Sequence, residues 1–133
     1  MQAFGIALDR VRPVEPLGYL EMLSLLDGAG MVLTDSGGIQ EESTVLGVPC
    51  LTLRDSTERP VTLTQGTNRL VPERTREAIL TAFGESWGQP TEGRRPELWD
   101  GATAERVVDV LAAWREGAPS PWPGTPSAVT SGR

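Results

Sequence analysis

The sequence predicts an α/β fold, in which helices flank a parallel sheet. Short apolar runs at residues 31–34 and 49–53 alternate with stretches of helical periodicity at 16–26 and 39–46. Such alternation is typical of parallel strands joined by right-handed crossovers. A glycine follows each of these two predicted helices, as is common at helix C-termini.

The elements before and after these runs follow from the same reasoning. A first short strand at 11–15 contains Pro13, which suits an edge or a strand end. The later elements are a turn at 65–68, a strand at 69–71, a helix at 73–83, a loop at 84–95 and a helix at 102–115. We expect one domain over residues 1–116. Residues 117–133, rich in Pro, Gly and Ser, are expected to form a disordered tail.

Composition excludes several classes of function. The 133 residues carry a formal net charge of −6, which argues against nucleic-acid binding because that requires basic patches. There is one cysteine and no histidine, so no internal disulfide, metal site or cofactor is expected. Cys50 lies within an apolar strand and is interpreted as a buried thiol rather than a nucleophile. No apolar run approaches the roughly 20 residues that cross a bilayer, and no signal peptide is recognisable, so we expect a cytoplasmic protein without a membrane segment.

The most informative segment is the glycine turn, residues 34–38, between a predicted strand and a predicted helix. The first turn of a helix leaves backbone N–H groups without partners, and the helix dipole adds positive charge there. Gly37 and Gly38 carry no Cβ that would hold a phosphate away from these donors, and Ser36 precedes them. The alternative is an ordinary strand-to-helix turn with a serine cap.

The helix that follows contains an acidic residue on its apolar side. At helical spacing, Val45 and Leu46 mark that side, whereas Gln40 and Thr44 point away from it. Glu42 falls among the apolar residues, one turn from the helix start. A buried carboxylate needs a partner, which is either the hydroxyl pair of a ligand or an arginine at the edge of the core.

A charged loop at residues 54–60 follows the next predicted strand. In an open α/β sheet, ligands bind at the carboxyl ends of strands, which brings this loop beside the glycine turn. Arg59 suits a diphosphate because its planar guanidinium pairs with phosphate oxygens through two N–H groups. The alternative is a solvated loop of mixed charge.

Three segments together resemble a known family. They are LTDSGGIQEE at 33–42, LGVPCLTLRDSTERP at 46–60 and GTNRLV at 66–71. At this spacing they closely resemble the non-hydrolysing UDP-N-acetylglucosamine 2-epimerases, over roughly residues 10–113. The resemblance implies a Rossmann-like sheet that forms part of the C-terminal domain of a GT-B-type fold.

The resemblance also implies a binding site for the UDP part of a UDP-sugar. The diphosphate would lie on Ser36, Gly37 and Gly38, and the ribose hydroxyls on Glu42. Arg59 would also contact UDP. The base would lie beside Leu17 and Met22, where some family members carry glutamine and an aromatic residue.

In this family the catalytic carboxylates, the catalytic histidine and an allosteric pocket lie on the N-terminal domain and hinge. The resemblance therefore implies no catalytic residue in this chain. We expect it to lack that domain and the first strands of its own domain, and to be inactive alone. The family isomerises UDP-sugars for bacterial envelope polysaccharides, and its members are often dimers. The alternatives are a GT-B glycosyltransferase donor domain and a catalytically silent nucleotide-binding fragment.

Overall fold

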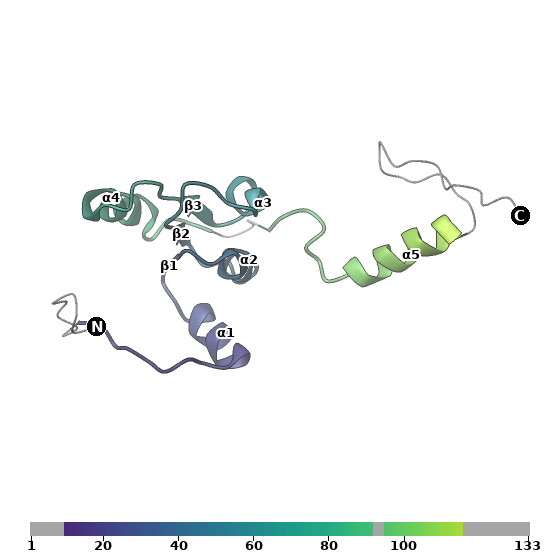
Figure 1. Cartoon of the computed structure of the whole chain (residues 1–133), viewed down its shortest axis with the longest axis horizontal. Coiled ribbons are helices and arrows are strands. Elements are labelled where there is room, and N and C mark those ends of the chain that lie inside the picture. Colours follow the sequence, from purple (N-terminus) through teal and green to yellow (C-terminus); the bar gives the residue numbers. More distant parts are fainter. Residues whose placement is uncertain (1–9, 92–94, 116–133) are drawn as a thin grey trace, which may run out of the picture. The chain divides into compact units, whose positions relative to one another are not determined.

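The computed structural model describes residues 10–91 and 95–115, which belong to two compact units that divide between Arg95 and Pro96. The first unit contains a parallel sheet of three strands in the order β1-β2-β3 (Figure 1). The strands are β1 (Val32–Thr34), β2 (Cys50–Thr52) and β3 (Asn68–Leu70). Its helices are α1 (Tyr19–Asp27), α2 (Gly37–Leu46), α3 (Pro60–Thr64) and α4 (Arg76–Ser86). The parallel α/β prediction is confirmed.

The register of the sheet aligns the carboxyl ends of its strands. Thr34 pairs with Thr52, and Thr52 with Leu70, so all three strands end at the same edge. The backbone bond from Leu53 N–H to Thr34 O, at 2.8 Å, extends the pairing beyond β2. The glycine turn and the loop at 54–59 therefore leave the sheet at one edge, as the sequence predicts.

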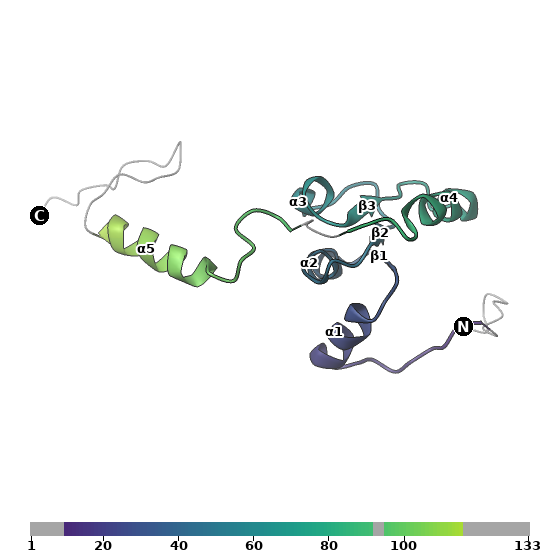
Figure 2. The ribbon, with the colours of Figure 1, turned by 180° about the vertical axis from the view of Figure 1, so that it is seen from behind.

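The face of the sheet toward α4 is apolar. Leu51, Val71 and Ala82 form a buried cluster, and Ile79 and Phe83 of α4 pack against it. Figures 1 and 2 show α4 on this side of the sheet, with α2 and α3 on the other. Burial of these side chains is the main hydrophobic contribution to the unit.

The face toward α2 is polar, and here the predicted orientation of the helix is wrong. Gln40 and Thr44, expected to point outward, are 0% and 1% exposed, whereas Val45 is 48% exposed. Ser43, also fully buried, completes a polar i, i+3, i+4 stripe against the sheet. The stripe can be buried because Gln40 and Ser43 find hydrogen-bond partners inside the protein, which a pattern of apolar residues does not reveal.

A close approach of backbones holds α2 and α3 beside β3. A Cβ on Gly66 would lie 2.6 Å from both Thr44 Oγ1 and Thr62 O. No other residue type fits here without a shift of the backbone. Gly66 is thus required by packing inside the protein.

The elements differ from prediction in four main places, and the first is helix α1, which begins at Tyr19 rather than at residue 16. The expected strand at 11–15 is wrong: residues 11–18 are irregular and exposed, and Pro13 has no N–H to offer a neighbouring strand. Helix α3 was not predicted; it is a single short helix with Pro60 in its first turn. Helix α4 begins at Arg76 rather than at 73, because the Thr75 side chain caps it.

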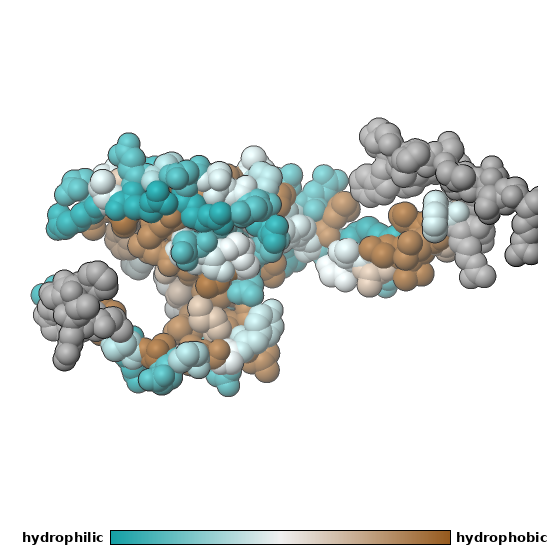
Figure 3. Space-filling model, viewed as in Figure 1, coloured by the Kyte–Doolittle hydropathy of each residue, from teal (hydrophilic) through white to brown (hydrophobic). Residues whose placement is uncertain are grey.

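The second unit consists of α5 (Thr103–Arg115) and the segment before it. Asp100 accepts hydrogen bonds from Ala102 N–H and from the Arg106 guanidinium, and the Arg106 bond lowers the pKa of Asp100 to about 2. Figure 3 shows apolar residues gathered on α5, where Val108 and Trp114 are each 62% exposed. The predicted tail lies outside the described residues, and the single domain over 1–116 stays a prediction. Among the described residues, no helix has both the length and the apolarity needed to span a membrane.

Candidate functional site

The site begins at the start of α2, at the carboxyl edge of the sheet. Ser36 is the N-cap residue, but its side chain makes no capping hydrogen bond. Its own N–H donates to Thr34 Oγ1 at 3.0 Å. The next N–H groups, from Gly37 to Ile39, have no partner within a regular helix. Ser36 is exposed, so this end of the helix faces solvent with its positive pole uncapped.

The two glycines of the turn are not explained by packing. A Cβ at Gly37 or Gly38 would meet no atom of the described residues within 4 Å, in contrast to Gly66. Neither glycine is among those with positive φ, so an alanine could adopt the same backbone. Glycine lowers helix stability by up to about 1 kcal/mol relative to alanine. The space above the turn is therefore free for something outside the chain.

Arg59 lies against the same helix. Its Nε donates to Glu41 Oε1 at 3.0 Å, and both side chains are about two-fifths exposed, at 43% and 39%. This pairing uses one of the five N–H donors of the guanidinium. Glu41 thus holds Arg59 against α2 one turn from the start of the helix, a contact that the residue pattern did not predict.

The other charges of the loop at 54–59 are paired with one another or with neighbours. Arg54 donates two hydrogen bonds to Glu58, at 2.8 and 3.1 Å, and these bonds lower the pKa of Glu58. Asp55 lies 3.5 Å from Arg74. Arg59 is therefore the arginine of this loop that pairs with α2, the helix that begins at the glycine turn.

Glu42 is half-buried rather than part of the core. Among the described residues its carboxylate has no hydrogen-bond or ion-pair partner, so the predicted alternative of a core-edge arginine is not found. The carboxylate is available one turn from the glycines. Its assignment to ribose hydroxyls stays a prediction.

The residues expected beside the base are less defined. Met22 is half-buried within α1, which packs against α2. Leu17 is 43% exposed, in the irregular segment before α1. Their contact with a base also stays a prediction.

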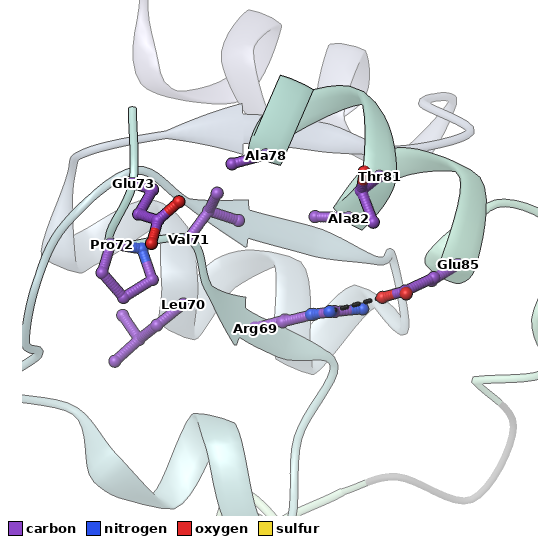
Figure 4. A pocket seen from close by; sticks show the side chains of 9 residues that line it. All are labelled: Arg69, Leu70, Val71, Pro72, Glu73, Ala78, Thr81, Ala82 and Glu85. Carbon is purple, nitrogen blue, oxygen red and sulfur yellow. Dashed lines mark ion pairs between the residues drawn. The ribbon is translucent and has the colours of Figure 1, made fainter. Parts of the chain in front are cut away.

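A separate hollow lies on the opposite side of the sheet, between the end of β3 and α4 (Figure 4). Arg69 and Glu85 face each other across it at 2.5 Å and neutralise each other's charge. None of the predicted site residues lines this hollow. Cys50 is buried as predicted, and burial raises the pKa of its thiol, which opposes a nucleophilic role.

These features define a Rossmann-like α/β unit with an uncapped helix start, two unconstrained glycines and, paired with α2, Arg59 at the carboxyl edge of its sheet. The comparisons identify the family. The model of the UDP-N-acetylglucosamine 2-epimerase family matches residues 2–112, and the chain belongs to this family.

Two relatives illustrate the match. The chain is 42% identical over 102 residues to the UDP-N-acetylglucosamine 2-epimerase of Methanocaldococcus jannaschii, covering 77% of this chain and 27% of that protein. It is 38% identical over 112 residues to the UDP-2,3-diacetamido-2,3-dideoxy-D-glucuronate 2-epimerase of Pseudomonas aeruginosa, covering 84% and 31%. The chain therefore spans less than a third of these relatives.

The solved structures agree with the fold. The structure of the M. jannaschii epimerase in complex with UDP-GlcNAc and UDP matches with a TM-score of 0.65, over 74% of this chain and 27% of the other. The three-stranded parallel sheet and its helices correspond to part of the C-terminal domain of a GT-B-type fold, as predicted.

Proposed function

We propose that this chain is the UDP-binding part of a UDP-N-acetylglucosamine 2-epimerase, which interconverts UDP-GlcNAc and UDP-ManNAc. The observation that carries the proposal is the start of α2: uncapped amides, glycines with open space above them, and Arg59 held at the same helix. A diphosphate supplies the negative charge and the acceptor oxygens that such a helix start stabilises.

Each predicted residue then has a role in holding UDP. The turn at Ser36, Gly37 and Gly38 contacts the diphosphate, to which Gly37 and Gly38 donate their N–H groups, since the N–H of Ser36 donates to Thr34 Oγ1. Arg59 adds charge-assisted hydrogen bonds through the guanidinium donors that are used neither by Glu41 nor by Glu58 O, which lies 3.4 Å from Nη1. Glu42 accepts from the ribose hydroxyls one turn further along α2, and Leu17 and Met22 flank the base.

The reaction we propose for the complete protein is elimination and re-addition of UDP. A base removes the C2 proton as the C1–O bond to UDP breaks, which leaves an unsaturated sugar beside UDP. UDP then returns to C1, and C2 is protonated on the opposite face. This chain's part is to keep the departed UDP in place and to stabilise the charge that grows on its phosphate.

The acid and base residues are proposed to lie on the part of these epimerases that this chain does not match, which by the family resemblance includes the N-terminal domain. We therefore expect the chain alone to bind UDP without catalysis. NMR of UDP-GlcNAc in D2O checks this: no deuterium should enter at C2 in the presence of the chain. Deuterium incorporation would place the catalytic groups here.

The UDP part of the substrate is supported more firmly than the sugar. The two relatives act, by their names, on different UDP-sugars, and UDP is what these sugars share. Both are epimerases, so the glycosyltransferase alternative has no support from them.

Calorimetry with two ligands tests the ribose assignment. Glu42→Gln should weaken binding of UDP more than binding of pyrophosphate, because pyrophosphate has no ribose. Glu41→Gln is the matched control: it changes the adjacent carboxylate, which contacts Arg59, and should alter both affinities by the same factor. Equal losses of UDP and pyrophosphate affinity in Glu42→Gln would rule out the ribose role.

A further inference from the structure

A network of polar side chains, all buried except the half-buried Thr57, connects the glycine turn to the Arg59 loop. Its centre is Gln40, whose side chain is fully buried in α2. We call it the Gln40 network, and its members are Gln40, Thr52, Thr57, Thr62 and Asn68.

Gln40 joins three segments through one amide group. Its Nε2 donates to Ser36 O in the glycine turn at 3.1 Å. Its Oε1 accepts from Thr57 Oγ1 of the loop at 2.6 Å and from Asn68 Nδ2 of β3 at 3.0 Å. Both lone pairs of that oxygen are therefore used, and the side chain has one orientation.

The network holds the backbone of Arg59 on both sides. Arg59 N–H donates to Thr57 Oγ1 at 2.9 Å, and Arg59 O accepts from Thr62 Oγ1 at 2.7 Å. Thr62 Oγ1 in turn accepts from Asn68 Nδ2 at 3.0 Å, and Asn68 Oδ1 accepts from Thr52 Oγ1 at 2.7 Å. A continuous series of hydrogen bonds thus connects the backbone of Arg59 to the carbonyl oxygen of Ser36.

We propose that Gln40 is a positioning residue, which fixes the Arg59 loop against the glycine turn so that both contact the same diphosphate. The inference rests on the proposed function for its ligand. A network in which each polar side-chain atom has a partner adds little net stability, but it determines a single arrangement of the segments it connects. Groups held in place before binding lose less freedom when the ligand arrives.

An amide side chain of this length is what the geometry needs. Glutamate would have no donor for Ser36 O, and methionine would have neither the donor nor the acceptor. Gln40→Met therefore removes the link with little change in volume. The matched control is Thr44→Val, equally buried on the same helix, because Thr44 Oγ1 has no hydrogen-bond partner in the described part of the chain.

Amide hydrogen exchange of the complete 133-residue chain without nucleotide gives the first test. Gln40→Met should speed exchange of the Arg59 and Thr62 amides at least tenfold and leave the amides of β2 protected. Thr44→Val should change neither. Unchanged exchange at Arg59 in Gln40→Met overturns the proposal.

The second test is a double-mutant cycle on UDP affinity, measured by calorimetry. Gln40→Met should weaken binding at least tenfold. Added to Arg59→Ala, it should cause much less further loss, since Gln40 acts through Arg59. Additive losses would show that Gln40 does not act through Arg59. Absence of UDP binding by the unaltered chain would refute the proposed function, while the exchange test still decides whether Gln40 positions the loop.

Thr57→Val keeps both tests decisive if Gln40→Met does not fold. It is isosteric, half-buried and outside α2, and it breaks the link between Gln40 and the Arg59 backbone. The same increase in exchange and the same non-additive loss are expected. Because Thr57→Val also removes the acceptor of the Arg59 N–H, the deciding signal in this variant is the Thr62 amide, and unchanged exchange there contradicts the proposal.

Discussion

The two faces of strand β2 are held by different interactions, hydrophobic packing on one and hydrogen bonds on the other. Leu51 points to α4 and is buried among apolar side chains, whereas its neighbour Thr52 points to α2 and donates to Asn68 at 2.7 Å. Hydrophobic burial has no direction and stabilises any well-packed arrangement. Hydrogen bonds between buried side chains fix which segments meet and at what distance. The apolar face keeps the unit folded, and the polar face sets the geometry of the candidate site.

The starts of α4 and α2 repeat this contrast. Thr75 caps α4 by accepting from Ala78 N–H at 3.2 Å. At α2 the N-cap side chain makes no such bond, and two glycines follow it. A helix start optimised for stability has a cap and few glycines. The start of α2 has neither property, as expected where a ligand completes it.

Truncation of the apolar face should have the largest effect. Leu51→Ala removes the centre of the cluster and should cost about 2–5 kcal/mol of unfolding free energy. Urea unfolding followed by circular dichroism measures it. Leu80→Ala, on the exposed side of α4, is the control and should stay within about 0.5 kcal/mol of the unaltered chain. Equal losses in the two variants would contradict the assignment of the core.

Arg59→Ala should act on binding alone. Loss of charge-assisted hydrogen bonds to a diphosphate should cost about 1.5–3 kcal/mol of binding free energy, a tenfold or greater fall in UDP affinity. Arg54→Ala, in the same loop but paired with Glu58, should leave the affinity within about threefold, as expected for an exposed ion pair away from the ligand. UDP affinity that is unchanged in Arg59→Ala, by calorimetry, refutes its role.

Gly38→Ala distinguishes the effect of this position on helix stability from its effect on ligand binding. The added methyl group meets no atom in the described part of the chain, so stability should be unchanged or raised by up to about 1 kcal/mol. UDP affinity should fall roughly tenfold, because the methyl group occupies the space of the diphosphate. Gly84→Ala in α4 also meets no protein atom and controls for helix propensity. Undiminished UDP affinity in Gly38→Ala would mean that the open space is not the ligand's.

Thr75→Ala should have the smallest effect, and it should lower the stability of the fold rather than the affinity for UDP. Loss of the α4 cap should cost about 1 kcal/mol of unfolding free energy and leave UDP affinity unaltered. Thermal unfolding with and without UDP measures both. A lower UDP affinity in this variant would connect the two helix starts, which the structure keeps on opposite faces of the sheet.

The sequence was informative where function depends on backbone and less so where it depends on side-chain packing. Alternating apolar runs predicted the parallel sheet, and the residue types of the glycine turn and of Arg59 indicated a candidate site. The rotation of α2 was not predictable from apolar spacing, because its buried side consists of Gln40, Ser43 and Thr44. Three polar residues at i, i+3 and i+4 are a signal that could have indicated a buried hydrogen-bonded stripe. The Glu41–Arg59 pair joins segments far apart in the chain, which no local pattern reveals.

An NMR titration of the complete, 15N-labelled chain with UDP tests the central claim most directly. Saturable shifts should concentrate on the amides of Gly37, Gly38 and Ile39 and on the Arg59 guanidinium. Pyrophosphate should shift the same signals more weakly. Shifts centred instead on Arg69 and Glu85, across the hollow beside α4, or no saturable shifts at all, would contradict the assignment of the glycine turn as the site of the diphosphate.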